Sequence, residues 1–372
     1  MIRILHTADV HIGREFPALR DKGPEYRRRL LATFERIIDL AILQDVQLLL
    51  IAGDLFDSNA VMGSPVRAVL ASFEKLHKAG IRVCLLPGMN DPYTEDSIYR
   101  FMHLPANVTV LTPQEPSHTY ADLDTTVYGR ACQSELSGTS AFEGLRLRTS
   151  SRFHIGLAHC LLRSDGVNDK VTMFIDSREI AASRLDYLAL GHWHTFRDCS
   201  EAATKAFYCG SPEPLDMNQK GTGSVALVTI HDKKRVDVQQ IGIGSHLFDE
   251  MTVNLDLFGS VEEIARMISA EADPNLILQV TLQGTHRTGH AIEIQELEKE
   301  LQEQFFCLRI LDQSSGGPGD VATAGHPPGI IGAFTKAIEA RMAKCPAKEK
   351  EIYAEASRLG VALLQKGTRV IT

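Results

Sequence analysis

Six side chains of metal-ligand types occur in four short segments, and they define the chemistry that this chain could perform. The segments are Asp9-Val10-His11, Gly53-Asp54, His159 and Gly191-His192-Trp193-His194. Carboxylates mixed with imidazoles suit Mn²⁺, Fe²⁺ or Zn²⁺ better than Ca²⁺, and the lack of thiolates in these segments argues against a closed structural zinc site. A bridging carboxylate can hold two ions about 3.5 to 4 Å apart, where the pair clamps a phosphate oxygen. We assign the bridge to Asp54 and divide His192 and His194 between the two ions.

The four segments each follow an apolar run of strand length, so strands must position the ligands. We predict strands at residues 2–7, 47–52, 82–86, 154–158 and 187–190, and helices at residues 25–43 and 66–78. Apolar runs that alternate with amphipathic helices predict an α/β sheet, and ligand-rich strand ends are where such sheets place their sites. After residue 107 the pattern becomes β-rich, with strands at residues 206–209, 224–230 and 235–241. This second half predicts a second sheet packed on the first.

The chain is long enough for more than one domain. It has 372 residues, which exceeds the size at which one hydrophobic core stops growing. We predict the main domain at residues 1–245 and, from an alternation of three strands with two helices, a small α+β cap domain at 246–312. Residues 313–328 are rich in Gly, Ser and Pro and are predicted to be a flexible linker. Residues 329–372 have helical periodicity and form the predicted helical tail.

Composition restricts the class of protein and its partners. Hydrophobic residues make up 44% and charged residues 23%, which is typical of soluble globular chains. A net charge of -8 leaves no global basic field to attract nucleic acid, so any DNA binding must be local. Seven cysteines without C-x-x-C spacing fit a reducing compartment. Because no apolar run has membrane length and no signal peptide precedes the first strand, we expect a cytoplasmic protein without membrane contact.

These motifs resemble those of the calcineurin-like metallophosphoesterases, and within them the SbcD/YhaO-type DNA repair exonuclease subunits. The matching segments are His6-Thr7-Ala8-Asp9-Val10-His11-Ile12-Gly13, Ala52-Gly53-Asp54-Leu55-Phe56-Asp57, Leu86-Pro87-Gly88 with Asp91, His159, Gly191-His192-Trp193-His194, and Tyr208-Cys209-Gly210-Ser211-Pro212-Glu213-Pro214. The resemblance extends from the first residue to about residue 241 and more loosely through the α+β unit. The metal motifs are specific to the superfamily, and the first and last segments favour the nuclease branch.

The resemblance implies a fold, a cofactor and an activity. The fold is a four-layer α-β-β-α sandwich, followed here by the cap domain and the helical tail. The cofactor is a pair of divalent ions, for which Mn²⁺ is expected and Fe²⁺ or Zn²⁺ are the alternatives. One ion is held by Asp9, His11, Asp54 and His194, and the other by Asp54, His159, His192 and an asparagine from a Gly-Asn-His-Asp loop. The activity is two-metal cleavage of DNA phosphodiester bonds in double-strand break repair.

The same resemblance implies partners. The usual partner is an SMC-like coiled-coil ATPase, on which the helical tail would dock; the alternative is that the tail packs on its own cap domain. The chain contains no P-loop, so ATP hydrolysis would belong to that partner. Residues 61–76 are suitably placed for a homodimer contact.

The loop that follows the third strand departs from the family pattern. It reads Gly88-Met89-Asn90-Asp91, so Met89 occupies the position of the asparagine ligand and Asn90 that of the catalytic histidine. Methionine is a weak ligand for a hard ion, which predicts a weaker second metal site. Asn90 has no titratable proton, and losing a positioned acid costs roughly 10² to 10⁴ in rate.

Three explanations of this loop compete. Asn90 is an engineered change that stops turnover, or the natural protein has relaxed catalysis, or the loop is shifted. In a shifted loop Asn90 would become the ligand and Asp91 would lie near the leaving group. We disfavour the shift because Pro87-Gly88 fixes the loop start and Asp91 keeps its spacing.

Two functions compete with an attenuated nuclease. One is a catalytically weak, DNA-end-binding scaffold for the ATPase, and the other is a phosphodiesterase for small substrates, because the site itself does not specify DNA. Arg14 and Trp193 are the candidate DNA contacts; the structural alternatives are a solvated charged face for Arg14 and packing under the site for Trp193. We interpret Asp57 as a residue that orients the loop after Asp54, and His6 as a packing residue.

Overall fold

The structure is a computed structural model in which two compact units can be distinguished. It describes residues 1–133, 138–144, 146–147, 149–163, 172–216, 219–232, 235–284, 294–314, 330–346, 350, 352–353, 356–357, 360 and 364. The first unit comprises Met1–Asp249 with Asn275–Ile277, and the second comprises Glu250–Pro274 with Leu278–Thr372. All of the predicted metal ligands lie in the first unit.

The first unit contains a mixed sheet whose central parallel strands are buried on both faces. Its strands are β1 (Ile2–Thr7), β2 (Leu48–Ala52), β3 (Arg82–Leu86), β4 (Val108–Val110), β13 (Gly221–Asp232) and β14 (Arg235–Asn254). The order is β14-β13-β1-β2-β3-β4, with β1 to β4 parallel and β13 antiparallel to β1. β2 reads Leu-Leu-Leu-Ile-Ala without alternation and is buried at all five positions. A continuous apolar run is what a strand covered on both sides requires.

A second sheet packs on the first. Its strands are β5 (Ser117–Tyr120), β6 (Thr125–Gly129), β7 (Phe153–His159), β10 (Tyr187–Gly191), β11 (Arg197–Asp198) and β12 (Lys205–Tyr208), in the order β11-β12-β10-β7-β6-β5. One buried cluster joins the sheets, combining Ile4 and Leu50 of the first with Ile155 and Ala189 of the second. The predicted second sheet is therefore present.

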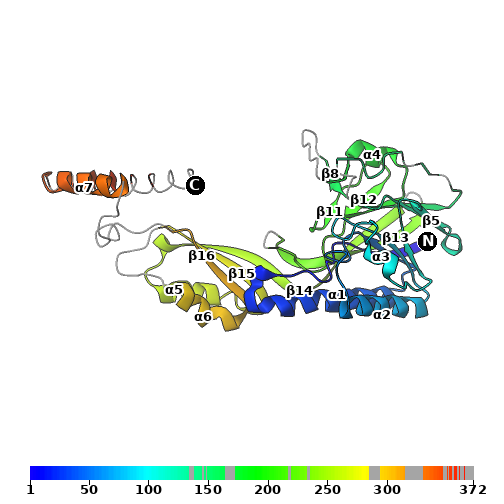
Figure 1. The fold of residues 1–372 in the computed structure, drawn as a ribbon, viewed down its shortest axis with the longest axis horizontal. Helices are drawn as coiled ribbons and strands as arrows, with labels where there is room; N and C mark the ends of the chain where they lie inside the picture. Colours follow the sequence, from blue (N-terminus) through cyan, green and yellow to red (C-terminus); the bar gives the residue numbers. More distant parts are fainter. Residues whose placement is uncertain are drawn as a thin grey trace. The chain divides into compact units, whose positions relative to one another are not determined.

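Helices cover the outer faces of the two sheets (Figure 1). α1 (Gly23–Leu43) and α2 (Ser64–Lys78) cover the first sheet, and the short α4 (Ser177–Ala182) lies beside the second. Apolar side chains three to four residues apart form the buried stripe of each long helix, as in Phe34, Ile38 and Ala41 of α1. Shorter elements are α3 (Ile98–Phe101), β8 (Leu161–Leu162), β9 (Phe174–Ile175), η1 (Pro17–Lys22) and η2 (Ala121–Leu123). The layers are those of the predicted α-β-β-α sandwich.

The second unit alternates helices with strands. Its elements are η3 (Leu255–Leu257), α5 (Val261–Ser269), β15 (Asp273–Gln283), α6 (Ile294–Leu301), η4 (Gln302–Gln304), β16 (Phe305–Asp312) and α7 (Ile330–Met342). The side chain of Ser260 caps α5 by accepting from Glu263 N. The first of the three strands expected in the cap domain is the end of β14, which is one continuous strand from Arg235 to Asn254.

The predicted linker and the last predicted helix fall mostly on undescribed residues. Residues 315–328 of the linker lie outside the described residues, as do most of residues 347–366. None of the helices in the described part of the chain is long and apolar enough to cross a membrane.

Candidate metal centre

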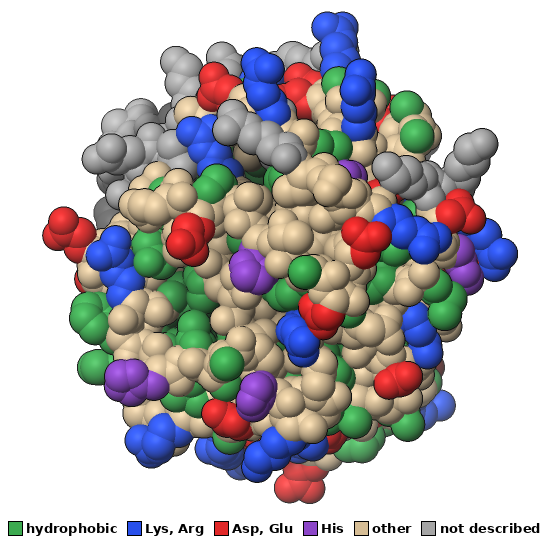
Figure 2. Space-filling model, turned by 90° about the vertical axis from the view of Figure 1, so that its right-hand side faces the viewer, with side chains coloured by type: hydrophobic (Ala, Val, Ile, Leu, Met, Phe, Trp, Pro, Cys, Tyr) green, Lys and Arg blue, Asp and Glu red, His purple; other side chains and the backbone are tan. Residues whose placement is uncertain are grey.

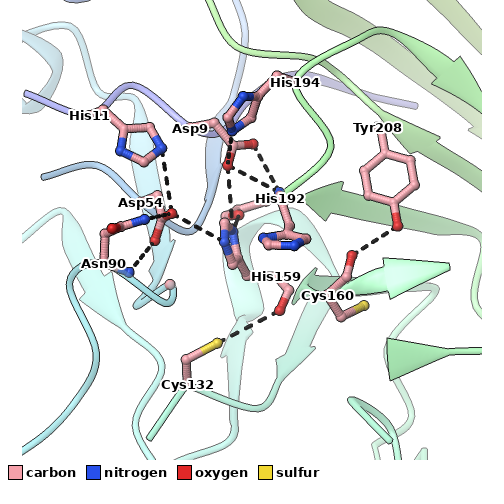
Figure 3. A network of polar contacts seen from close by, with 12 residues as sticks. Asp9, His11, Asp54, Asn90, Cys132, His159, Cys160, His192, His194 and Tyr208 are labelled. Atoms are coloured by element: carbon pink, nitrogen blue, oxygen red, sulfur yellow. Dashed lines mark hydrogen bonds and ion pairs between the residues drawn. The ribbon is translucent and has the colours of Figure 1, made fainter. Parts of the chain in front are cut away.

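The ends of four strands bring the predicted ligands together. β1 and β2 pair in parallel in the first sheet, and β7 and β10 do so in the second, where Gly191 is opposite His159. Asp9 and Asp54 follow β1 and β2, His159 ends β7, and His192 and His194 follow β10. Because parallel strands end at the same edge, side chains from distant parts of the sequence converge there (Figure 3).

The backbone at this edge is strained. Asp9, His11, Asp54 and His192 have φ values of 52°, 51°, 51° and 96°, a region that residues other than glycine seldom adopt. Such conformations persist where the surrounding structure enforces them, and they concentrate at functional sites. The position before Asp54 requires glycine, because Gly53 has a φ of +90° and a Cβ there would lie 2.2 Å from His159 Nδ1. Four of the six ligand residues are therefore in strained conformations.

Asp54 lies at the centre of the cluster. Its Oδ2 is 3.5 Å from His11 Nε2 and 3.3 Å from His159 Nε2. The side chains of His11, Asp54 and His159 are all buried. One carboxylate oxygen thus lies between imidazoles from two different strands, which is the position that a bridging ligand requires.

The ligand atoms of the centre form two groups, of which only one contains Asp54, the predicted bridge. Asp9, His11 and His194 form one group and Asp9, Asp54 and His159 the other, with the ligand atoms of each group within 4.8 Å of one another. The prediction assigned Asp9 to one ion, whereas in the structure it belongs to both groups. His192 belongs to neither; its backbone N donates to Asp9 Oδ2 at 2.9 Å, and its ring centroid is 5.2 Å from that of His159. The structure brings all six predicted ligands to one place.

Two of the imidazoles are oriented by hydrogen bonds on their far side. His11 Nδ1 is 2.9 Å from Asp57 Oδ1, and His159 Nδ1 is 2.9 Å from the carbonyl oxygen of Ala52. With the proton on Nδ1, each ring presents the lone pair of Nε2 towards Asp54. Both Nε2 atoms are buried without a hydrogen-bond partner among the described residues. A buried polar atom without a partner is costly, so the donor set fits divalent cations that bind these nitrogens.

The electrostatics of the cluster also fit a cation. Burial by itself would raise the pKa of Asp54, but the charges of His159 and His11 lower that pKa below its usual range. Burial opposes the charged form of His159, yet Asp54 outweighs it and raises the pKa of His159 to about 10. The pKa of His192 is lowered to about 4 by burial and by the charge of His159. Without an ion, a proton on His159 supplies the positive charge that a bound metal would supply.

The unusual loop places Asn90, and not Met89, against Asp54. Asn90 N donates to Asp54 Oδ1 at 2.8 Å, and Asn90 Nδ2 donates to Asp54 Oδ2 at 2.5 Å (Figure 3). Met89 is half-buried and packs against the hydrophobic cluster that contains Tyr128 and Cys132. The loop approaches closely because Gly88 has no side chain: a Cβ there would lie 2.2 Å from Asp54 Oδ1.

Asp91 is enclosed by the protein. Its side chain is buried, and its oxygens accept hydrogen bonds from Phe56 N at 3.0 Å, from Gly88 N at 2.7 Å and from the hydroxyl of Tyr99. Burial, followed by the charge of Asp54, raises the pKa of Asp91 to about 6. Asp91 was predicted to be catalytic, but a catalytic contact needs an accessible carboxylate. In this structure Asp91 anchors the loop.

The remaining candidates lie at the rim of the centre. Arg14 Nη1 is 3.7 Å from Asp57 Oδ1, so its guanidinium lies near the partner of His11. Trp193 is 44% exposed. His6, interpreted from the sequence as a packing residue, is buried, and its Nδ1 is 2.9 Å from the hydroxyl of Tyr187 in the other sheet. The contact between Asn90 and Asp54 was not predicted, because the sequence analysis disfavoured the loop shift that would make Asn90 a ligand.

Fold and site together define a class of protein. Two packed β-sheets between helices, with carboxylates and imidazoles at the strand ends, are the features of a metallophosphoesterase. A family model described as calcineurin-like phosphoesterase matches residues 2–196. The chain belongs to the calcineurin-like phosphoesterase family, as its motifs predicted.

Individual relatives are similar at low identity. The uncharacterized metallophosphoesterase YhaO of Bacillus subtilis (strain 168) is 25% identical over 76% of this chain and 72% of its own length. A DNA double-strand break repair protein Mre11, from Sulfurisphaera tokodaii, is 24% identical over 81% of this chain and 77% of its own length. The SbcD subunit of the nuclease SbcCD, from Escherichia coli (strain K12), is 24% identical over 65% of this chain and 68% of its own length. Relatives named as break repair and nuclease proteins thus resemble this chain along most of its length.

Proposed function

We propose that this chain is a metal-dependent DNA exonuclease subunit that acts in double-strand break repair. The observation that carries the proposal is the pair of buried imidazole nitrogens, His11 Nε2 and His159 Nε2, that face Asp54 without another partner. The similarity to relatives named as break repair and nuclease proteins supports DNA as the substrate. Asp9, His11, Asp54 and His194 would hold one ion, and Asp54, His159 and His192 would hold the other.

Each group of the site would have its own role in phosphodiester cleavage. Two bound divalent ions, with Mn²⁺ preferred, would supply the positive charge that stabilises a phosphoryl group during cleavage. Asp57 and the carbonyl of Ala52 keep His11 and His159 in the tautomer that binds a cation. The Asn90 amide can donate a hydrogen bond to a phosphoryl oxygen, but it has no proton to give to the leaving oxygen. Cleavage is therefore expected to be slow.

Attraction of DNA has to come from the site itself. On the face shown in Figure 2, Lys and Arg side chains are interspersed with Asp and Glu, and the chain has a net charge of -8. A surface of mixed charge does not produce the uniform basic field that would steer DNA to the protein over a long range. Bound cations, with Arg14 beside Asp57, would concentrate positive charge where the phosphate has to bind.

The partners remain part of the proposal. An SMC-like coiled-coil ATPase would bind the helical tail, of which α7 (Ile330–Met342) is the described part. Residues 61–76, which include most of α2, would form a homodimer contact. Gel filtration at high concentration tests the dimer, and a monomer under those conditions contradicts it.

Hydrolysis assays test the function. A labelled DNA duplex and bis-p-nitrophenyl phosphate are incubated with the protein and added manganese, and an Asp54→Asn variant serves as the control. DNA cleavage that disappears in the variant supports the nuclease. Cleavage of the small ester alone supports a small-substrate phosphodiesterase.

A second candidate function rests on the unusual loop. Met89 packs in a hydrophobic cluster and Asn90 carries no acid, so the chain can also be a DNA-end-binding scaffold with little catalysis. Manganese binding without turnover of either substrate would favour this scaffold.

A further inference from the structure

Trp193 is an accessible aromatic residue directly beside the metal centre. It is the only tryptophan of the chain and is 44% exposed. In the described ranges, its indole takes part in no hydrogen bond and no ring contact. A large aromatic side chain between two clustered histidines is thus left with a face that packing does not use.

A pocket of about 370 Å³ opens at this residue. Its lining includes Trp193, Leu161, His192, His194, Asp216 and Gln219. Because His192 and His194 also belong to the metal centre, a group bound in this pocket would be adjacent to a phosphate held there. Pockets that bind small ligands have volumes of about 300 to 1,000 Å³. The pocket suits a single nucleotide unit better than a longer segment.

Two of the polar side chains in the wall, Gln219 and Asp216, contact other parts of the protein. Gln219 Nε2 donates to Ser211 Oγ, and Gln219 Oε1 accepts from Leu215 N at 3.0 Å. Asp216 Oδ2 is 3.9 Å from His194 Nδ1. Recognition in this pocket would therefore depend on the flat face of the indole and on Leu161 more than on hydrogen bonds.

We propose that Trp193 is a stacking platform for a nucleobase of the substrate, the base that belongs to the phosphate bound at the metal centre. The inference rests on the proposed function and narrows its substrate class to phosphoesters that carry a nucleobase. Every base has a π-face, so stacking on a tryptophan tolerates any sequence. Because stacking recognises the face of a base and not its edges, the platform selects for the presence of a base and not for its identity.

Binding of two phosphates that differ only in the base tests the platform. The full chain, loaded with manganese, is titrated with deoxyadenosine 5′-monophosphate and with 2-deoxyribose 5-phosphate. Tryptophan fluorescence reports on Trp193 alone, because the chain has no other tryptophan. We expect the nucleotide to quench this fluorescence and to bind about tenfold to hundredfold more tightly than the sugar phosphate.

Two variants keep the test specific. In Trp193→Leu, calorimetry should give nearly equal affinities for the two phosphates, whereas Trp193→Phe should retain most of the preference because it keeps an aromatic face. Equal affinities in the unmodified chain, or no binding of either phosphate, would overturn the proposal. So would a preference that is unchanged in Trp193→Leu.

Failure of the platform can be told apart from failure of the proposed function. Nucleotide binding needs no turnover, so the preference for the base is measurable even in a chain that cleaves no DNA. Conversely, hydrolysis of the DNA duplex that is lost in Asp54→Asn supports the nuclease even if the two phosphates bind equally.

Discussion

The two halves of the metal centre are built differently. The half around His11 takes its ligands from strand ends, and Asp57 Oδ1 lies 2.9 Å from the far nitrogen of that ring. The half around His159 has an equally buried imidazole, oriented by the carbonyl of Ala52, but its remaining edge is the loop with Met89 and Asn90. The first half is complete in carboxylates and imidazoles, whereas the second has a hydrogen-bonded amide where the family has a ligand and an acid.

This asymmetry shows how such a site can be attenuated without unfolding. The strand-end ligands lie on strained backbone next to two buried cores, so the fold fixes their positions. The loop is anchored separately, through Asp91, Phe56 and Tyr99. Residues 89 and 90 can therefore change while the first half keeps its geometry.

The largest effect is expected from Asn90→His. A histidine restores a titratable proton near the leaving oxygen, and positioned acids contribute roughly 10² to 10⁴ in rate. Single-turnover cleavage of a labelled DNA duplex with manganese measures the gain. Asn90→Gln is the matched control, since it keeps an amide and adds no proton. A histidine variant no faster than Asn90→Gln would favour the scaffold function.

A smaller effect is expected from Asp57→Ala on the first half. The Asp57 carboxylate fixes the tautomer and the orientation of the His11 ring through Nδ1. Removing a partner of this kind reduces metal affinity by about 10- to 100-fold. Asp57→Asn keeps an acceptor oxygen and should lose much less. Calorimetric manganese titration of both variants measures the difference, and equal affinities would show that Asp57 does not orient His11.

Met89→Asn should strengthen the second half alone. The hydrophobic cluster that Met89 occupies disfavours an amide, so the new side chain should turn towards the second ion. An amide oxygen is a better ligand for a hard ion than a thioether, so we expect the affinity of the weaker manganese site to rise by about tenfold. Met89→Leu, which retains an apolar side chain, is the control. If Met89→Asn strengthens the tighter site instead, the assignment of the loop to the second ion is incorrect.

The sequence predicted the ligand-bearing strands because two independent signals coincided there. Apolar runs marked β1, β2, β7 and β10, and the ligand types followed directly after each run. The environment of the loop could not be predicted, because the side-chain directions of Met89 and Asn90 depend on cavities formed by residues far apart in the sequence. For the same reason Asp91 looked like a catalytic residue from its spacing, although Tyr99 and two backbone N–H groups enclose it.

The last expected effect is on stability and concerns His6 in β1, the strand that precedes Asp9 and His11. Burial lowers the pKa of His6 to about 3, so the folded chain keeps His6 neutral while the unfolded chain protonates it near pH 6.5. The neutral His6 therefore contributes to the free energy of unfolding above about pH 6.5. This contribution is lost as the pH falls towards about 3, and the free energy of unfolding decreases by up to about 1.4 kcal/mol per pH unit.

His6→Gln tests this assignment. Glutamine can still hydrogen-bond to the hydroxyl of Tyr187 but does not titrate, so its stability should fall less steeply below about pH 6.5. Urea unfolding of the first unit in the presence of a chelator measures both slopes. Identical slopes would mean that another group takes up the proton.

Manganese binding at equilibrium tests whether the centre binds two ions with different affinities, one in each half. Calorimetric titration of the chelator-treated chain, with the free ion followed by electron paramagnetic resonance, gives the number of ions and the affinity of each. We predict two ions whose dissociation constants differ by about tenfold or more, with the tighter one lost in His11→Ala and the weaker one lost in His159→Ala. A single ion, or two ions of equal affinity that both depend on the same histidine, would contradict this asymmetric centre.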